Sequence, residues 1–139
     1  MSITINDIRD GVIYTIKQQF PTMKIYGEEV KQGFREPCFF IKVLQLDHAK
    51  EINRHYIRTH SFDVHYFGLS NEDMHNVADN LYNILEYISI TGGLCRGVRM
   101  KHEIVDRALH FFVDYKIRLI KETEDNPKLK ELEVNEYGK

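Results

Sequence analysis

The sequence predicts an α+β domain with one mainly antiparallel sheet of four to five strands, long hairpins, and two helices packed on one face. The order of the patterns is the first reason, because helical spacing alternates with long runs of strand-like spacing. The second is the length of those runs, which exceeds the roughly 20 Å of an ordinary strand. Finally, 139 residues with 42% hydrophobic and 29% charged side chains suit a single globular domain.

Two stretches have the apolar spacing of helices. The first is Ile5–Phe20, which Thr4 or Asn6 could cap. The second is Asn71–Ile88, preceded by Ser70 with an aspartate three residues later, a pattern typical of a capping box. The apolar stripe of the second helix is large enough to cover a core.

Between the helices the pattern predicts a short strand and a long hairpin. Lys24–Val30 is expected to be a short strand or an extended segment, and a turn follows. Cys38–Leu46 is apolar on both faces, which predicts burial on both sides or contact with a partner. Asp47–Asn53 is expected to be a charged, projecting tip. Arg54–Phe67 alternates over roughly 46 Å at ~3.3 Å per residue, more than the second helix can cover.

A second long hairpin follows the second helix. Leu94–Val105 and Ala108–Lys121 are the strands, joined by a tight turn at Asp106-Arg107. The expected register pairs Ile104 with Leu109, Met100 with Val113, Val98 with Tyr115, and Arg99 with Asp114. This register places both apolar sets on one face of the sheet.

The C-terminal stretch has a different composition from the rest. We expect residues 1–121 to form the domain and residues 122–139 to be an acidic, flexible tail with six acidic residues and three lysines. Leu129, Leu132 and Val134 could form a weak helix there, although disorder in isolation is the stronger expectation.

Several function classes receive no support from the sequence. A net charge of −2 gives no global attraction to nucleic acid, and no apolar run is long enough to span a bilayer. The N-terminus has no signal-peptide pattern, so we expect synthesis in the cytoplasm with Cys38 and Cys95 reduced. The seven histidines form no metal-binding motif, so we expect no metal, no cofactor and no enzymatic activity.

Charged and apolar side chains offer two kinds of candidate interface. The basic residues near the first hairpin tip are Lys50, Arg54, His55 and Arg58. They could contact a neighbouring subunit or, together with Arg96, Arg99 and Lys101, bind a nucleic-acid backbone. A mixed-charge rim for subunit contacts comprises Glu28, Glu29, Lys31 and Arg35, and the adjacent apolar candidates are Phe40 and Leu44.

Two segments, IYGEEVKQGFREPCFFIKVL (residues 25–44) and NRHYIRTHSFDVHYF (residues 53–67), resemble the small tail terminator, or tail completion, proteins of tailed phages and prophages. The resemblance implies a ring, commonly of six copies, at the neck end of the virion tail after synthesis in the bacterial host cytoplasm. Such a ring stops growth of the tail tube and joins it to the head-side connector. It implies no cofactor and no catalysis, with nucleic acid at most passing through the ring lumen.

Overall fold

The computed structural model describes residues 3–27, 35–91, 93–121 and 129–131. It contains two helices and seven strands, which are α1 (Ile5–Gln19), β1 (Lys24–Tyr26), β2 (Cys38–Lys50), β3 (His55–Phe67), α2 (Asn71–Ile84), β4 (Tyr87–Ile90), β5 (Gly93–Val105), β6 (Ala108–Lys121) and β7 (Leu129–Glu131).

The strands form one curled, mixed sheet. Six of them follow the order β1-β2-β3-β6-β5-β4, and β7 pairs with β6 outside that path. The pairing of β1 with β2 is parallel and the other pairings are antiparallel. The predicted α+β class is therefore confirmed, but the predicted count of four to five strands was too low. The strands that the prediction missed, β4 and β7, have only four and three residues, too few to show a clear alternation.

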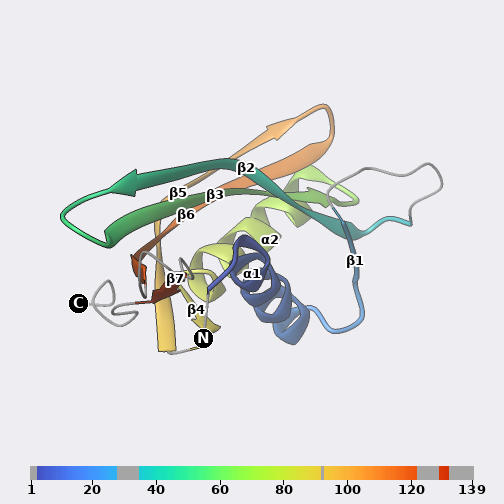
Figure 1. Ribbon diagram of the computed structural model, residues 1–139. Helices are drawn as coiled ribbons and strands as arrows, with labels where there is room; N and C mark the ends of the chain where they lie inside the picture. The colour runs from blue at the N-terminus through green and yellow to red at the C-terminus, as the bar shows by residue number, and fades with distance from the viewer. Residues whose placement is uncertain (1–2, 28–34, 92, 122–128, 132–139) are drawn as a thin grey trace.

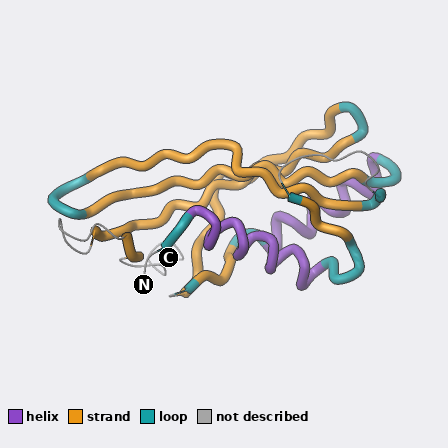
Figure 2. Tube along the Cα trace, turned by 45° about the vertical axis from the view of Figure 1, so that its right-hand side comes forward, coloured by secondary structure: helices purple, strands orange, loops and turns teal. Residues whose placement is uncertain are grey.

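Both helices lie against the same face of the sheet (Figures 1 and 2). We call this face the helix face, marked on β3 by Phe62, Val64 and Tyr66, which are at most 1% exposed. The opposite, outer face carries Asp63 and His65. Every second residue of β6 from Leu109 to Leu119 is buried on the helix face, as predicted.

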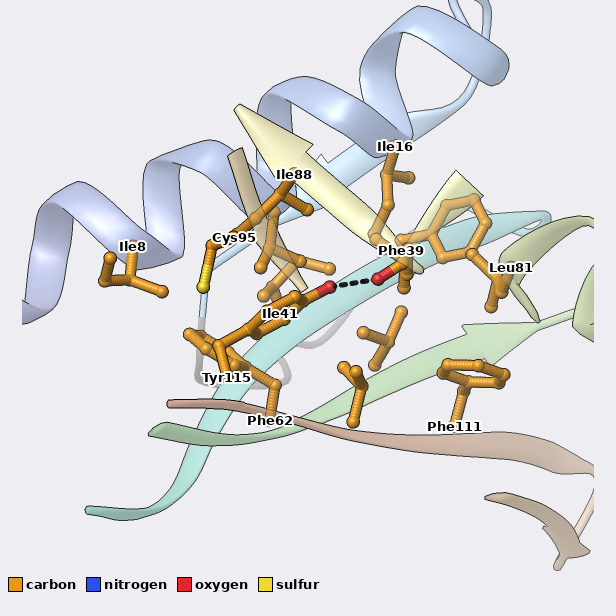
Figure 3. Close-up of a cluster of buried hydrophobic side chains, with 14 of the residues drawn as sticks. Ile8, Ile16, Phe39, Ile41, Phe62, Leu81, Ile88, Cys95, Phe111 and Tyr115 are labelled. Atoms are coloured by element: carbon orange, nitrogen blue, oxygen red, sulfur yellow. Dashed lines mark hydrogen bonds between the residues drawn. The ribbon is translucent and has the colours of Figure 1, made fainter. Parts of the chain in front are cut away.

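Aromatic and aliphatic side chains from both layers form the core (Figure 3). Within it, the Tyr115 hydroxyl donates a hydrogen bond to the carbonyl oxygen of Leu85 at 2.7 Å. This bond joins the middle of β6 to the end of α2 and satisfies a buried polar group.

Both helices begin where the sequence predicts. Thr4 caps α1 with a reciprocal capping box, and the Ser70 side chain accepts a hydrogen bond from the Asp73 backbone N–H at α2. The predicted end of the second helix at Ile88 was wrong, because α2 ends at Ile84 and the chain then forms β4. Ile88 is buried in β4, and because a buried apolar residue fits a helical stripe as well as a strand, its apolar character did not distinguish the two.

The second hairpin follows its predicted register only near the turn. Ile104 pairs with Leu109 as expected, but an irregularity between Val98 and Lys101 shifts the remaining pairs. Val98 therefore pairs with Asp114 rather than Tyr115. Arg99, inside this bulge, has a φ of 56°. Because a bulge inserts an extra residue, it moves the following side chains to the opposite face, and sequence alternation alone does not locate it.

The first hairpin is longer than expected. Its ladder extends from Cys38↔Phe67 to Lys50↔Tyr56, so most of the predicted loop Asp47–Asn53 is strand. Near the other end of the chain, Leu129–Glu131 forms β7 on β6, where the sequence suggested disorder or a weak helix. None of the described helices is long and apolar enough to cross a membrane.

Candidate functional site

The end of the first hairpin, residues 46–58, extends beyond the two helices (Figures 1 and 2). We call it the hairpin end. β6 runs beside its β3 strand as far as the pair His55↔Ile120. A backbone hydrogen bond of 2.8 Å from Lys121 N–H to the Arg54 carbonyl oxygen continues this contact into the turn. The hairpin end is thus part of a three-stranded sheet, with β6 as the third strand, rather than a free two-stranded ribbon.

The turn of the hairpin presents an apolar side chain to solvent. Its backbone is closed by hydrogen bonds from Glu51 N–H to the His55 carbonyl oxygen (2.8 Å) and from His55 N–H to the Ile52 carbonyl oxygen (3.0 Å). Asn53 adopts a left-handed conformation with a φ of 57°, which asparagine tolerates better than most residues. Ile52 is 73% exposed at this tip, next to a hollow of about 420 Å³. Ile52 is thus the exposed apolar side chain at the far end of the hairpin.

Cationic and aromatic side chains cluster on the helix face of the hairpin end. The Arg58 Nε donates a hydrogen bond to His48 Nδ1 at 3.2 Å, and the His48 ring stacks on Tyr56 with centroids 4.9 Å apart. The Lys121 ammonium lies 5.8 Å from the centre of the same Tyr56 ring. Burial lowers the pKa of His48, and the charges of Arg58 and Lys121 lower it further. His48 therefore acts here as a neutral acceptor between two fixed cations.

The structure brings four of the predicted interface residues together. Lys50, Arg54, His55 and Arg58 all lie at the hairpin end. Lys50 and Arg58 share the helix face with Tyr56, whereas the alternation of β3 places His55 on the outer face. His48 and Ile52 belong to the same surface, although sequence reasoning omitted both. The isolated apolar residue in a polar turn was the available signal for Ile52.

Three further predicted interface residues, Arg35, Phe40 and Leu44, are described and are not part of this surface. Arg35 is exposed beyond β1 and its N–H donates to the Tyr26 hydroxyl at 3.3 Å. Leu44 is 52% exposed at a β-bulge in β2. Phe40 is only 1% exposed, because Tyr26 stacks on it and Phe67 meets it edge-on, so it supports the subunit's own packing. Glu28, Glu29 and Lys31 lie outside the described residues.

Both long outer strands have open edges in the part of the chain that the structure describes. β1 pairs with β2 only at residues 38–40, so no described strand lies beside the remainder of β2 on the edge opposite β3. At the other side of the sheet, β4 covers β5 only at residues 93–96. Unpaired backbone groups along such edges can pair with another chain.

The second basic group predicted from the sequence lies on a different surface. Arg99 forms an ion pair with Asp114 at 3.7 Å, and Lys101 lies 5.5 Å from the Phe112 ring centre. Both line an outer-face groove of about 780 Å³ that also contains Asp47, Glu103 and Asp114. The two cationic groups thus lie on opposite faces of the sheet, and acidic side chains interrupt one of them. This arrangement does not favour a continuous strip for a nucleic-acid backbone.

The two cysteines are buried, with 0% exposure. Burial, with a smaller contribution from the charge of Glu36, raises the pKa of the Cys38 thiol to about 11. Because the thiolate is the reactive form, such a thiol is a poor nucleophile at neutral pH.

One histidine constellation was missed by sequence reasoning. Asp63 and His65 on β3 lie beside His110 on β6, with their ligand atoms within 4.8 Å of one another. The strand alternation places Asp63 and His65 on one face, but only the register between distant strands brings in His110.

The sequence was compared with protein-family models and with curated proteins. A family model described as "Phage tail terminator protein" matches residues 7–127, which is most of the chain. A search among curated proteins found no match. The match includes α1 from residue 7 onward, all of α2, and all strands except β7. The chain therefore belongs to the phage tail terminator family, and this family indicates a structural role as a component of a phage tail.

Proposed function

We propose that the chain is the subunit of a closed ring that caps the tail tube at the neck end of the virion tail. The ring ends polymerisation of the tube protein and offers the joining surface for the head-side connector. The hairpin end is the observation that carries this proposal, since it projects beyond the helices and exposes 73% of Ile52 at its tip.

The edges of β2 and β5 that no described strand covers support the same proposal. They lie on opposite sides of one sheet, so a contact between the β2 edge of one copy and a surface near β5 of the next is a head-to-tail contact. Head-to-tail contacts generate closed rings when the rotation between copies closes. We propose six copies, the number that the family resemblance implies.

The helix face of the hairpin end is polar and cationic, because it carries Arg58, His48, Tyr56 and Lys121. We propose that it meets an acidic or aromatic surface of the neighbouring copy. Charged groups at such a contact set its register and its partner more than its affinity.

The test combines light scattering with negative-stain imaging, on the chain alone and with purified tail tubes. The wild-type chain is expected to form rings, or to form caps on tube ends if assembly requires the tube. Ile52→Asp should abolish ring or cap formation, because it places a charge at the centre of the contact.

Leu69→Asp is the matched control. Leu69 is as exposed as Ile52, at 77%, but lies at the start of α2, away from the hairpin end. This variant should assemble like the wild type. A wild-type chain that stays monomeric and never caps tubes would contradict the proposed ring. Equal loss of assembly in both variants would contradict the role of the hairpin end.

A further inference from the structure

Three metal-ligating side chains converge on the outer face of the sheet. His65 Nε2 lies 2.7 Å from Asp63 Oδ2, and His110 Nδ1 lies 3.1 Å from the same oxygen. The two imidazole rings meet edge to face with centroids 4.3 Å apart. The cluster sits on β3 and β6, which run side by side in the centre of the sheet (Figure 1).

The strand geometry fixes these three side chains. Asp63 and His65 are two residues apart on β3 and therefore point to the same face. His110 is the direct cross-strand partner of His65 in the antiparallel register. Directly opposed side chains have Cβ atoms ~5 Å apart, so both rings reach the carboxylate without leaving a regular strand.

The carboxylate of Asp63 is left incompletely satisfied by this arrangement. Asp63 is only 6% exposed, and its Oδ1 atom is buried without a hydrogen-bond partner among the described residues. A buried carboxylate is costly unless a cation or enough donors compensate it. Lys42 is its cross-strand partner on β2, yet no ion pair between them is present in the described part of the chain. Asp63 Oδ1 is therefore an acceptor that could ligate a cation.

We propose that Asp63, His65 and His110 bind one divalent transition-metal ion of the Zn²⁺ type. The ligands are His65 Nε2, His110 Nδ1 and the Asp63 carboxylate, with a fourth position for water. Two imidazoles and one carboxylate suit Zn²⁺, whereas Mg²⁺ and Ca²⁺ prefer oxygen ligands. A tetrahedral ion with bonds of ~2.0–2.1 Å places its ligand atoms about 3.3 Å apart, so the Asp63–His65 pair would open only slightly from 2.7 Å.

The site is accessible to an ion from solvent. The side chains of His65 and His110 are 17% and 23% exposed, and Phe112, the cross-strand partner of Asp63, is a half-buried residue of the same outer face. Glu103 is the partner of His110 on β5 and is exposed. A bound ion would cross-link the two central strands, β3 and β6, independently of the proposed ring.

The test uses the full-length chain after treatment with a chelator and dialysis. Calorimetric titration with Zn²⁺ alone should give a stoichiometry of one ion per chain. Thermal denaturation should show a higher melting temperature with Zn²⁺ than without it. Titration with Co²⁺ should give the visible absorption of nitrogen and oxygen ligands without thiolate charge transfer, which excludes Cys38 as a ligand. Asp63→Asn and His110→Ala should each weaken Zn²⁺ binding by at least about tenfold.

His75→Ala is the matched control. His75 and His102 form the other close histidine pair, with nitrogens 3.3 Å apart, so this variant should lose nothing if the proposed cluster is the site. Circular dichroism must show that each variant is folded, and Asp63→Asn is the shape-conserving variant if His110→Ala fails to fold. Absence of stoichiometric Zn²⁺ binding to the wild-type chain would overturn the proposal. Unchanged affinity in Asp63→Asn, or loss of binding in His75→Ala, would also overturn it.

Discussion

His60 is a polar residue in an apolar position. It lies on the helix face of β3 between Leu46 of β2 and Tyr115 of β6, and it is 0% exposed. Neither ring nitrogen has a hydrogen-bond partner among the described residues. Burial, and to a smaller extent the charge of Arg58, lowers the pKa of His60 to about 4. The folded chain therefore holds this ring neutral.

Because the pKa of His60 is lowered in the folded chain, we expect the chain to lose stability against unfolding in mild acid. The unfolded chain binds a proton at His60 below its ordinary pKa of about 6.5, whereas the folded chain does so only near pH 4. The free energy of unfolding should therefore fall as the pH drops from about 6.5 to 4, by up to about 3 kcal/mol from this group.

His60→Leu provides the measurement. Urea denaturation of both chains at several pH values should show a smaller loss of stability for the variant over this window. Parallel pH profiles for the two chains would show that the acid sensitivity arises elsewhere. From the sequence, His60 was visible only as a break in the apolar parity of its strand. Its burial follows from how the layers pack, which a strand pattern cannot show.

The turn between β5 and β6 was predicted from the sequence, and its two residues adopt a strained backbone conformation. The sequence placed a two-residue turn at Asp106-Arg107, and both residues have positive φ values, 51° and 66°. Two-residue hairpin turns of this kind favour glycine at the second position, because a side chain is strained there.

Arg107→Gly is expected to stabilise the chain by about 0.5–1 kcal/mol, since relief of the strained φ outweighs the greater freedom of glycine in the unfolded state. Arg107→Ala is the control, because it removes the same side chain but keeps the Cβ atom. Thermal denaturation should raise the melting temperature of the glycine variant alone. An equal gain in both variants would assign the effect to the arginine side chain instead.

Other elements depended on information that local patterns lack. The reversal of side-chain parity in β5 arises from the bulge near Arg99, whose position depends on pairing with β6. The short strands β4 and β7 are defined by their partners, β5 and β6, rather than by their own sequences. The long strands and the helix starts were predictable because alternation and capping residues are local signals.

At the scale of the whole molecule, stability and assembly are expected to depend on different residues. Phe62 is 0% exposed beneath the helices and meets Tyr115 edge to face. Arg58 lies on the same face of β3, four residues before Phe62, at the hairpin end. Phe62→Ala should cost about 3–5 kcal/mol of unfolding free energy, and Arg58→Ala less than about 1 kcal/mol.

Only Arg58→Ala should weaken assembly while leaving the subunit folded. Denaturation curves and light scattering on the same preparations separate the two effects. Similar losses of stability in both variants would contradict this division. The sequence predicted that the long strand β3 would extend beyond the helix that covers it. The interface candidates at the hairpin end were chosen for that reason. It did not reveal the metal-ligand cluster, because His65 and His110 meet only through the order of strands in the sheet.

That strand order also determines when the chain can fold. The central ladder joins β3 to β6, pairing residues as distant along the chain as His55 and Ile120. Loop-closure entropy makes such long-range pairing slow, typically milliseconds to seconds for domains of this kind. During synthesis the first hairpin emerges well before β6, and its inner edge must wait until nearly the entire domain has left the ribosome. The inner edge of the hairpin is therefore unpaired during this interval, and unpaired strand edges of this kind are prone to mispairing and aggregation.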